Sequence, residues 1–302
     1  MKHGWFIGAL AASVLCACGG GPGAAPAPPP PPVPSPPSLS ALGYALESGG
    51  RSGPRMLDEY PMASAASTRS FQEFGGAGIR FDPSGTLWSD QIGSFNGYHP
   101  DGSSAGTMNV QDQLRAFDAR GMLYAASCCS VNVYFVGIGN AAVLLRSITT
   151  TPSFACSAAA DGAGNLFVSF CTAGPGVFSI WSNLDEYAPN ASGAAVPLVT
   201  NAVATGPVTV DAAGNVYAAY NGSIGIWQAG TFSAGAPDRT LPIAPGNTIT
   251  DIAADRAGNV YAVTRAVPSS LSAPRTLLYF AAGSASAVTL QSGAIGSVTA
   301  VP

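Results

Sequence analysis

Charged residues are scarce in this sequence. Only 9% of its 302 residues are Asp, Glu, Lys or Arg, and Lys2 is the only lysine. Without Lys2, which lies in the N-terminal segment described below, 11 Arg stand against 16 acidic residues, a net charge of −5. Because proteins that bind nucleic acid need a basic face to neutralise phosphates, this balance argues against a nucleic-acid partner.

The common catalytic motifs are also missing. The sequence contains no HExxH, no pair of CxxC motifs and no phosphate-binding glycine loop. Residues 102–106 fit G-x-S-x-G, with His99 and Asp101 close by. That motif requires a strand-turn-helix elbow, and no helix is predicted there. No helical periodicity stands out elsewhere either, which favours an all-β chain.

Residues 1–17 are predicted to be a signal peptide. Lys2 precedes a mostly apolar stretch, residues 5–15, that is too short to span a membrane. The stretch ends in LCAC at residues 15–18, which resembles the bacterial lipobox, whose last Cys is lipidated and becomes the mature N-terminus. The resemblance implies lipid attachment at Cys18 and a membrane as partner. An ordinary secretory signal with incidental cysteines is the alternative.

The residues after Cys18 indicate where such a lipoprotein would lie. Gly19 stands where an Asp would resemble an inner-membrane retention signal, so the outer membrane of a bacterial cell envelope is favoured. The sequence does not indicate whether the protein faces the periplasm or the cell surface. Residues 18–38 are rich in Pro, Gly and Ala and cannot build a core. They are predicted to be a semi-stiff linker that holds the domain of residues 39–302 away from the membrane.

One pattern recurs five times within residues 39–302. A short apolar run leads into Asp-x-x-Gly, and two further residues lead into an aromatic residue and a second apolar run. Successive aspartates are 36, 43, 50 and 44 residues apart. A period near 43 residues that is built only of strand signals predicts a β-propeller. The repeated aspartates are Asp82, Asp118, Asp161, Asp211 and Asp255.

Each repeat is predicted to be a β-hairpin. The Asp can accept hydrogen bonds from the amides that follow it, and the Gly suits a left-handed backbone. The aromatic residue falls six positions after the Asp, so it should lie on the same face of every hairpin and fill the space between neighbouring blades. Calcium binding is the alternative for these turns, but each carries one carboxylate and they should lie far apart. The aromatic residues are Trp88, Tyr124, Phe167, Tyr217 and Tyr261.

The two ends of the domain complete each other. Residues 295–301 look like a first strand without a continuation, and residues 41–48 look like a second strand. Residues 55–60 and 68–74 look like the outer two strands of the same blade. Pairing of the two chain ends would close the ring without an unpaired inner edge. The fold class predicted is therefore all-β, a six-bladed propeller with about 44 residues per blade.

The repeat Asp-x-x-Gly-Asn-(Leu/Val)-(Tyr/Phe/Trp)-(Ala/Val) resembles the NHL repeat. More broadly, it is similar to the six-bladed propellers of the SMP-30/gluconolactonase and virginiamycin B lyase kind. The resemblance covers about the whole of residues 39–302, although Thr86 and Met122 replace its Asn. It implies the architecture and leaves the activity open, because one fold serves many functions.

The enzymes of these families set conditions that the sequence meets poorly. The SMP-30 family holds a divalent metal with a carboxylate and two Asn, and the lyase needs a His base. After the signal peptide the chain has a single histidine, His99, in a predicted outer turn. The nearest equivalents of the metal ligands by residue type, which cannot be aligned with that family's ligands, are Glu47, Asp90 and Asn221.

A ligand site is expected in the central funnel, at the end opposite to the Asp turns. Residues about nine or ten positions after each Asp should reach that end. They include carboxylates, an Arg, an Asn and a Tyr, which could hold a small polar ligand; a solvated rim is the alternative. No metal site and no cofactor are predicted. The candidate ligand-binding residues are Glu47, Asp90, Tyr220, Asn221 and Arg265.

Four cysteines lie beyond residue 18, and an exported protein should oxidise them. Cys156 and Cys171 lie on the two arms of the third hairpin, opposite each other within one residue, which favours a disulfide between them. Cys128 and Cys129 would then form a vicinal pair. The alternatives join Cys156 or Cys171 to the neighbouring blade.

The sequence therefore predicts an envelope lipoprotein whose propeller is a binding or protein-interaction scaffold rather than an enzyme. A protein, a glycan or a small molecule remains open as the ligand. The alternative is a lactonase, hydrolase or lyase of the SMP-30 or virginiamycin B lyase type, and only this alternative requires a divalent metal.

Overall fold

The structure is a computed structural model, in which residues 36–302 form one compact unit. The predicted signal peptide, Cys18 and the linker lie outside the residues that it describes. No helix in the described part is long and apolar enough to cross a membrane. The described residues are 44–48, 55–62, 64–67, 69–73, 78–91, 93–127, 129–150, 154–173, 179–197, 199–201, 204–267 and 273–300.

The described strands form six four-stranded sheets. Five sheets use four consecutive strands each, and the sixth combines the last strand with the first three. The five are β4 (Ile79–Phe81), β5 (Leu87–Gln91), β6 (Ser94–Tyr98) and β7 (Ser104–Met108); β8 (Gln113–Phe117), β9 (Met122–Ala126), β10 (Ser130–Val136) and β11 (Ala142–Thr149); β12 (Phe154–Ala160), β13 (Leu166–Ala173), β14 (Ser179–Tyr187) and β15 (Val199–Asn201); β16 (Ala204–Val210), β17 (Val216–Tyr220), β18 (Ser223–Trp227) and β19 (Arg239–Pro242); and β20 (Asn247–Ala254), β21 (Val260–Ala266), β22 (Arg275–Phe280) and β23 (Ala287–Gly293). The sixth sheet has the order β24 (Ile295–Ala300), β1 (Tyr44–Ser48), β2 (Arg55–Tyr60) and β3 (Arg69–Glu73).

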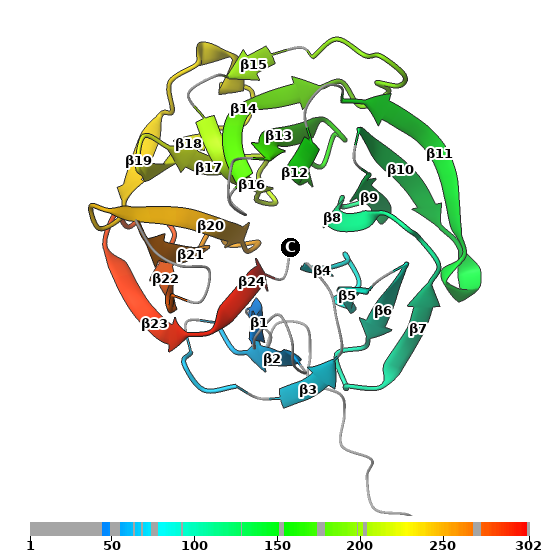
Figure 1. Cartoon of the computed structure of the whole chain (residues 1–302), viewed down its shortest axis with the longest axis horizontal. Helices are drawn as coiled ribbons and strands as arrows, with labels where there is room; N and C mark the ends of the chain where they lie inside the picture. Colours follow the sequence, from blue (N-terminus) through cyan, green and yellow to red (C-terminus); the bar gives the residue numbers. More distant parts are fainter. Residues whose placement is uncertain are drawn as a thin grey trace, which may run out of the picture. The chain divides into compact units, whose positions relative to one another are not determined.

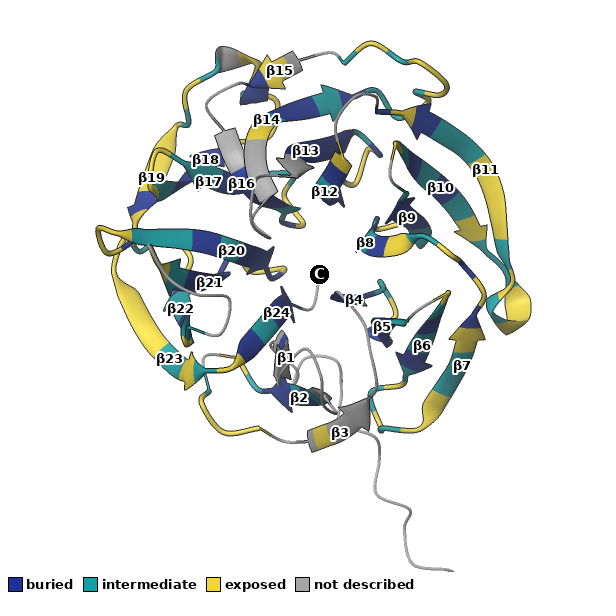
Figure 2. Ribbon diagram, viewed as in Figure 1, coloured by how far each residue is buried: buried dark blue, intermediate teal, exposed yellow. Residues whose placement is uncertain are grey.

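The sheets surround a common centre as the blades of a β-propeller (Figure 1). Each inner strand contacts the inner strands of both neighbouring sheets, in the order β4, β8, β12, β16, β20, β24 and back to β4. The all-β propeller predicted from the repeats is therefore confirmed. Buried residues concentrate on the inner strands, and exposed residues on the outer strands (Figure 2).

The propeller has two distinct ends, because paired strands are antiparallel throughout. The turns between first and second strands and the loops between third and fourth strands share one end, which we call the Asp-turn end. The turns between second and third strands and the connections between sheets share the other, which we call the funnel end.

The predicted pairing of the two chain ends is present. In the sixth sheet β24 pairs with β1, with Tyr44 opposite Ala300 and Leu46 opposite Val298. Val298 is completely buried. Since β24 also contacts β20 and β4, the last strand of the chain ties three sheets together.

The repeated aromatic residues fill the space between sheets, as predicted. All five are buried, and each lies in one apolar cluster with residues of the sheet that follows. Trp88, for example, packs with Leu114 and Leu123 of the next sheet. Space around these rings is tight, since a Cβ added to Gly97 would come within 2.8 Å of the Trp88 ring.

The Asp turns contain the predicted hydrogen bonds from backbone amides to the Asp, together with a contact that was not predicted. In Asp211, Oδ1 accepts the amides of Ala213 and Asn215, each at 2.9 Å. Its Oδ2 accepts the Asn215 side chain at 2.8 Å and the Tyr217 hydroxyl at 2.7 Å. In this turn the repeated aromatic therefore also caps the Asp of its own hairpin, as Trp88 and Tyr124 do in theirs. At the fourth position the Gly has a positive φ in every turn: Gly85, Gly121, Gly164, Gly214 and Gly258.

In the two turns that lack the repeat's Asn, other side chains supply its hydrogen bond to the Asp. Asn165 and Asn259 donate their side-chain amides to the Asp of their own turn, at 2.7 Å each. Where Thr86 stands, the indole of Trp88 donates to Asp82 instead, at 2.9 Å. In the turn with Met122, the Arg120 guanidinium donates to Asp118 Oδ2 at 2.6 Å, and the Tyr124 hydroxyl donates at 3.1 Å. These bonds cap the turns as predicted and engage the carboxylate of each Asp named.

Candidate functional site

Irregular inner strands shape the funnel end. The pairing of β8 with β9 shifts register between Leu114 and Ala116, and that of β12 with β13 shifts between Ala155 and Ser157. Arg115 and Cys156 are the extra residues of these two bulges. A bulge re-aims its side chain and bends the strand, and here it turns both residues toward the space between the two sheets.

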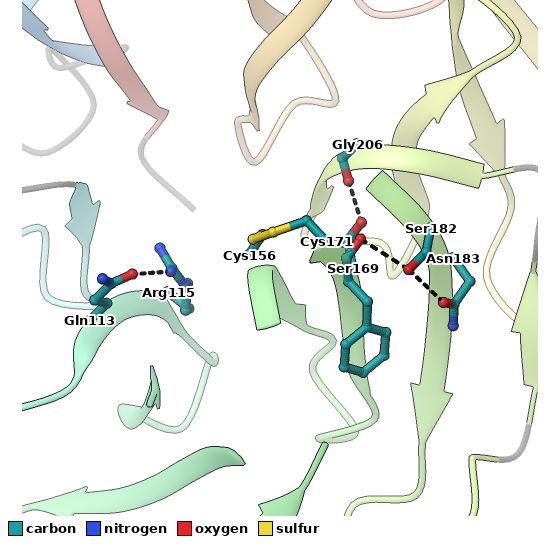
Figure 3. Close-up of a disulfide and its surroundings, with 9 residues drawn as sticks. Gln113, Arg115, Cys156, Ser169, Cys171, Ser182, Asn183 and Gly206 are labelled. Atoms are coloured by element: carbon teal, nitrogen blue, oxygen red, sulfur yellow. Dashed lines mark hydrogen bonds between the residues drawn. A yellow bond between two sulfur atoms is a disulfide. The ribbon is translucent and has the colours of Figure 1, made fainter. Parts of the chain in front are cut away.

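A pocket of about 460 Å³ lies at this place. Figure 3 shows Gln113 and Arg115 on one side of the gap and the Cys156–Cys171 disulfide on the other. The predicted disulfide is present, with Cα atoms 5.8 Å apart. The vicinal pair cannot be compared, because Cys128 lies outside the described residues. The pocket is lined by Gln111, Asp112, Gln113, Arg115, Ala126, Ser127, Phe154, Ala155, Cys156 and Cys171.

Arg115 is the charged group between this pocket and the central channel. It also lines a channel cavity of about 70 Å³. Its guanidinium donates to Gln113 Oε1, while its buried Nε has no hydrogen-bond partner. Burial, and then the charge of Arg80, lower the pKa of Arg115 to about 10. The side chain therefore keeps its positive charge at neutral pH.

Arg80 and Asp251 form an ion pair among the inner strands. Arg80 donates to the backbone carbonyls of Arg115 and Ile79, at 2.6 Å each, and approaches Asp251 Oδ1 at 3.8 Å. Asp251 accepts the Val298 amide at 2.9 Å. Burial raises the pKa of Asp251, and the nearby Arg80 opposes that shift. These contacts join β4, β8, β20 and β24, so the pair is a clamp between sheets.

The acidic side chain of the pocket is fixed by its neighbours. Asp112 Oδ2 accepts the Tyr134 hydroxyl at 2.6 Å and the Asn132 side chain at 2.7 Å. Burial and the bond to Asp112 raise the pKa of Tyr134 to about 12, so it remains a proton donor. On the same wall the hydroxyls of Ser127 and Ser130 lie 2.7 Å apart.

The four candidate ligand-binding residues whose side chains the structure describes, Asp90, Tyr220, Asn221 and Arg265, are not among the residues that line this pocket. Asp90 is buried, and its Oδ2 accepts the Leu114 amide of the next sheet at 3.1 Å, which ties two sheets together. Glu47 pairs through its backbone with Leu57, and its side chain is outside the description.

The other three candidates belong to two further sheets. Asn221 has φ 46° and precedes Gly222 with φ 73°. This two-residue Asn-Gly hairpin turn accounts for the residue type without a ligand. The Tyr220 ring packs edge-on against Trp227, with centroids 5.9 Å apart. Arg265 is half-buried and pairs across strands with Arg275.

The residues named as equivalents of SMP-30 metal ligands are spread around the ring. Glu47, Asp90 and Asn221 belong to three different sheets, and the Asp90 carboxylate already holds a backbone amide. Across the described ranges, no group of three His, Cys, Asp or Glu side chains is placed to hold an ion. His99 lies in the β6–β7 turn at the Asp-turn end, remote from the funnel. Ser104 of the G-x-S-x-G match begins the outer strand β7, so no nucleophile elbow forms.

Solved structures with the same fold exist at low sequence identity. A protein of unknown function from Bacteroides caccae superposes with a TM-score of 0.57 and 11% identity, over 85% of this chain and 98% of its own. The periplasmic gluconolactonase PpgL of Pseudomonas aeruginosa superposes with a TM-score of 0.53 and 12% identity, over 83% of this chain and 82% of its own. Neither protein-family models nor curated proteins match the sequence. At these identities the likeness shows the β-propeller fold alone.

Proposed function

We propose that this chain is an NHL-like propeller of the bacterial cell envelope that binds a small anionic ligand in the pocket beside Arg115. The sheet made from both chain ends counts as its sixth blade. The observation that carries the proposal is the Arg115 side chain, a positive charge that lines a pocket of about 460 Å³ and donates to the neutral side chain of Gln113.

An anionic group is the ligand feature that suits this arrangement. A buried charge is costly unless it is paired with an opposite charge. The acidic groups near Arg115 are already engaged, Asp112 with two side chains and Asp251 with a backbone amide and Arg80. A ligand carboxylate or phosphate supplies an opposite charge, and guanidinium binds both with well-aligned pairs of hydrogen bonds.

The pocket volume limits the size of the ligand. Small-molecule sites usually measure about 300–1,000 Å³, and this pocket lies in the lower part of that range. Gln111, Gln113 and Ser127 add neutral polar groups to the wall. A sugar acid, with one carboxylate and several hydroxyls, matches both features.

Substitution of Arg115 tests the proposal. Gluconate is the first probe and inorganic phosphate the second, with affinity measured by isothermal titration calorimetry. Arg115→Gln should weaken binding at least tenfold, because it removes the charge and keeps much of the volume. Arg256→Gln, an exposed arginine in the turn of Asp255, is the matched control and should change nothing. The site would be rejected if the wild-type protein binds neither probe. It would also be rejected if both variants lose affinity equally.

Lactone hydrolysis is the second candidate. Its support is the shared fold with a protein described as a periplasmic gluconolactonase. The same protein preparations can be assayed with D-glucono-1,5-lactone against the buffer rate. Hydrolysis that disappears in Arg115→Gln would favour an enzyme over the binding module, and a rate equal to that of buffer would exclude this reaction.

Lipid attachment at Cys18 is the remaining part of the proposal. It is supported by the LCAC sequence behind the apolar core of the signal peptide, and more than one acyl chain anchors a protein stably. We expect mass spectrometry of the mature N-terminus to find an acylated Cys18, in the outer-membrane fraction. An unmodified N-terminus, or cleavage at another position, would contradict it.

A further inference from the structure

The pocket beside Arg115 also contains a negative charge. Asp112 lies in the chain just before β8 and lines the same pocket of about 460 Å³ as Arg115. Two donors hold its carboxylate, the Tyr134 hydroxyl and the Asn132 side-chain amide, and both reach Oδ2. Since both donors are uncharged, they fix the direction of this carboxylate and do not balance its charge.

The two charges of the pocket do not neutralise each other. Asp112 and Arg115, both within the described part of the chain, form no ion pair with one another. Arg115 donates to the neutral side chain of Gln113. Burial is the main cause that lowers the pKa of Arg115, and the acidic groups that oppose this shift are Asp90 and Asp251. The pocket therefore presents one positive and one negative group, each held by neutral partners.

The chain limits the distance between these two groups. Asp112 and Arg115 are three residues apart, so their Cα atoms are separated by at most about 11 Å. Both side chains line the same pocket, and Figure 3 shows the Arg115 guanidinium beside Gln113. A ligand that contacts both groups must therefore carry a negative and a positive charge at opposite ends of a short chain.

The wall across from Arg115 belongs to the next sheet and is apolar. It is made by residues of β12 and β13, with the disulfide facing the gap (Figure 3). Phe154 of β12 is 43% exposed there. A hydrocarbon chain can pack on this wall, while its hydroxyls meet the neutral polar groups of the other wall. The apolar lining residues are Phe154, Ala155, Cys156 and Cys171.

We propose that the ligand of this pocket is an amino sugar acid, whose carboxylate binds Arg115 and whose terminal ammonium group donates to Asp112 Oδ1. The assignment of the carboxylate rests on the proposed function, and the ammonium contact goes beyond it. An ammonium group has three donors and no acceptor, so it suits the carboxylate oxygen that neither Tyr134 nor Asn132 holds. Asp112 is thereby the residue that distinguishes an amino sugar acid from a plain sugar acid.

The experiment compares two probes that differ in one group. At pH 7, 6-amino-6-deoxy-D-gluconate carries an ammonium group where gluconate carries a hydroxyl. In isothermal titration calorimetry the unchanged protein should bind the amino probe at least about tenfold more tightly than gluconate. Asp112→Asn should remove this preference and keep the affinity for gluconate, because the amide retains an oxygen that accepts from Tyr134.

Asp101→Asn is the matched control. It removes the same charge from an exposed Asp in the β6–β7 turn, at the Asp-turn end, and the preference for the amino probe should persist. Equal affinity of the unchanged protein for both probes would overturn the ammonium contact and leave the anionic site standing. Loss of both probes in Asp112→Asn would also overturn it, because Asp112 would then hold the pocket wall and not the ligand. Binding of neither probe by the unchanged protein would reject the proposed function, and this inference with it.

Discussion

Deleting residues 295–302 is expected to lower the thermal midpoint by more than about 10 °C, or to prevent the protein from accumulating. The deletion removes β24, the inner strand of the sixth sheet and its contact with two neighbouring sheets. A loss this large exceeds what eight terminal residues usually contribute, because chain ends are commonly frayed.

Two losses add together in this variant. The apolar side chains of Ile295 and Val298 are buried, and removing large buried residues costs about 2–5 kcal/mol each. Asp251 also loses the amide of Val298 and stays close to Arg80 inside the channel. A buried charge that loses its donors is strongly destabilising. The edge of β1 is left without a partner, which favours aggregation.

Differential scanning calorimetry measures the effect. Deletion of residues 301–302 alone is the control, because it leaves β24 intact. It should unfold within about a degree of the full chain. If the longer deletion also unfolds within a degree or two of the full chain, β24 does not close the ring and the sixth sheet is not a blade.

The sequence contains enough to predict the ring because the repeat is local. Each Asp turn is built from residues within six positions of its Asp, so five copies are visible without any knowledge of distant contacts. The half-repeats at residues 41–48 and 295–301 indicated closure for the same reason. The Cys156–Cys171 disulfide was predictable because both cysteines lie on one hairpin.

The pocket could not be predicted in the same way. The candidates were counted forward from each Asp along the second strand. Arg115 was not among them because it lies three residues before Asp118, on the first strand, where a bulge turns it toward the pocket. One signal was available: Arg80 and Arg115 are the charges within the otherwise apolar runs IRF and LRAF before their aspartates. Asn221 was selected for its polarity, although the turn explains it.

The exposure of the β10–β11 hairpin could not be predicted from the sequence either. Residues 142–149 read as an apolar strand, which is how a buried strand also reads. Only the structure places β11 at the outer edge of its sheet, where Leu144 and Leu145 meet solvent. Burial in a propeller depends on strand order, and strand order is a property of the whole blade.

The second large effect concerns the Asp turns, whose aspartates should differ in their contribution to stability. Asp211→Ala should lower the free energy of unfolding by about 3 kcal/mol, because it breaks four hydrogen bonds to a buried carboxylate. It also leaves the Tyr217 hydroxyl without its acceptor, where it packs against the next sheet. A Cβ on Gly258 of that sheet would lie 3.5 Å from Asp211 Oδ2 and 3.6 Å from the hydroxyl.

The matched variant is Asp161→Ala. Asp161 is only half-buried, and it accepts the Asn165 amide at 2.8 Å and the Asn165 side chain at 2.7 Å. The aromatic of that hairpin is Phe167, which has no hydroxyl to donate. We therefore expect a loss of about 1 kcal/mol, typical of a partly exposed cap.

A double-mutant cycle isolates the bond between Asp and aromatic. Tyr217→Phe should cost about 1–2 kcal/mol in the wild-type background and much less once Asp211 is Ala, since a hydrogen bond to a charged group contributes about 1.5–3 kcal/mol. Urea unfolding of the four proteins gives the coupling energy. Equal losses for Asp211→Ala and Asp161→Ala, or a coupling energy near zero, would mean that the aromatic acts by packing alone and that the Asp is held only by its own turn.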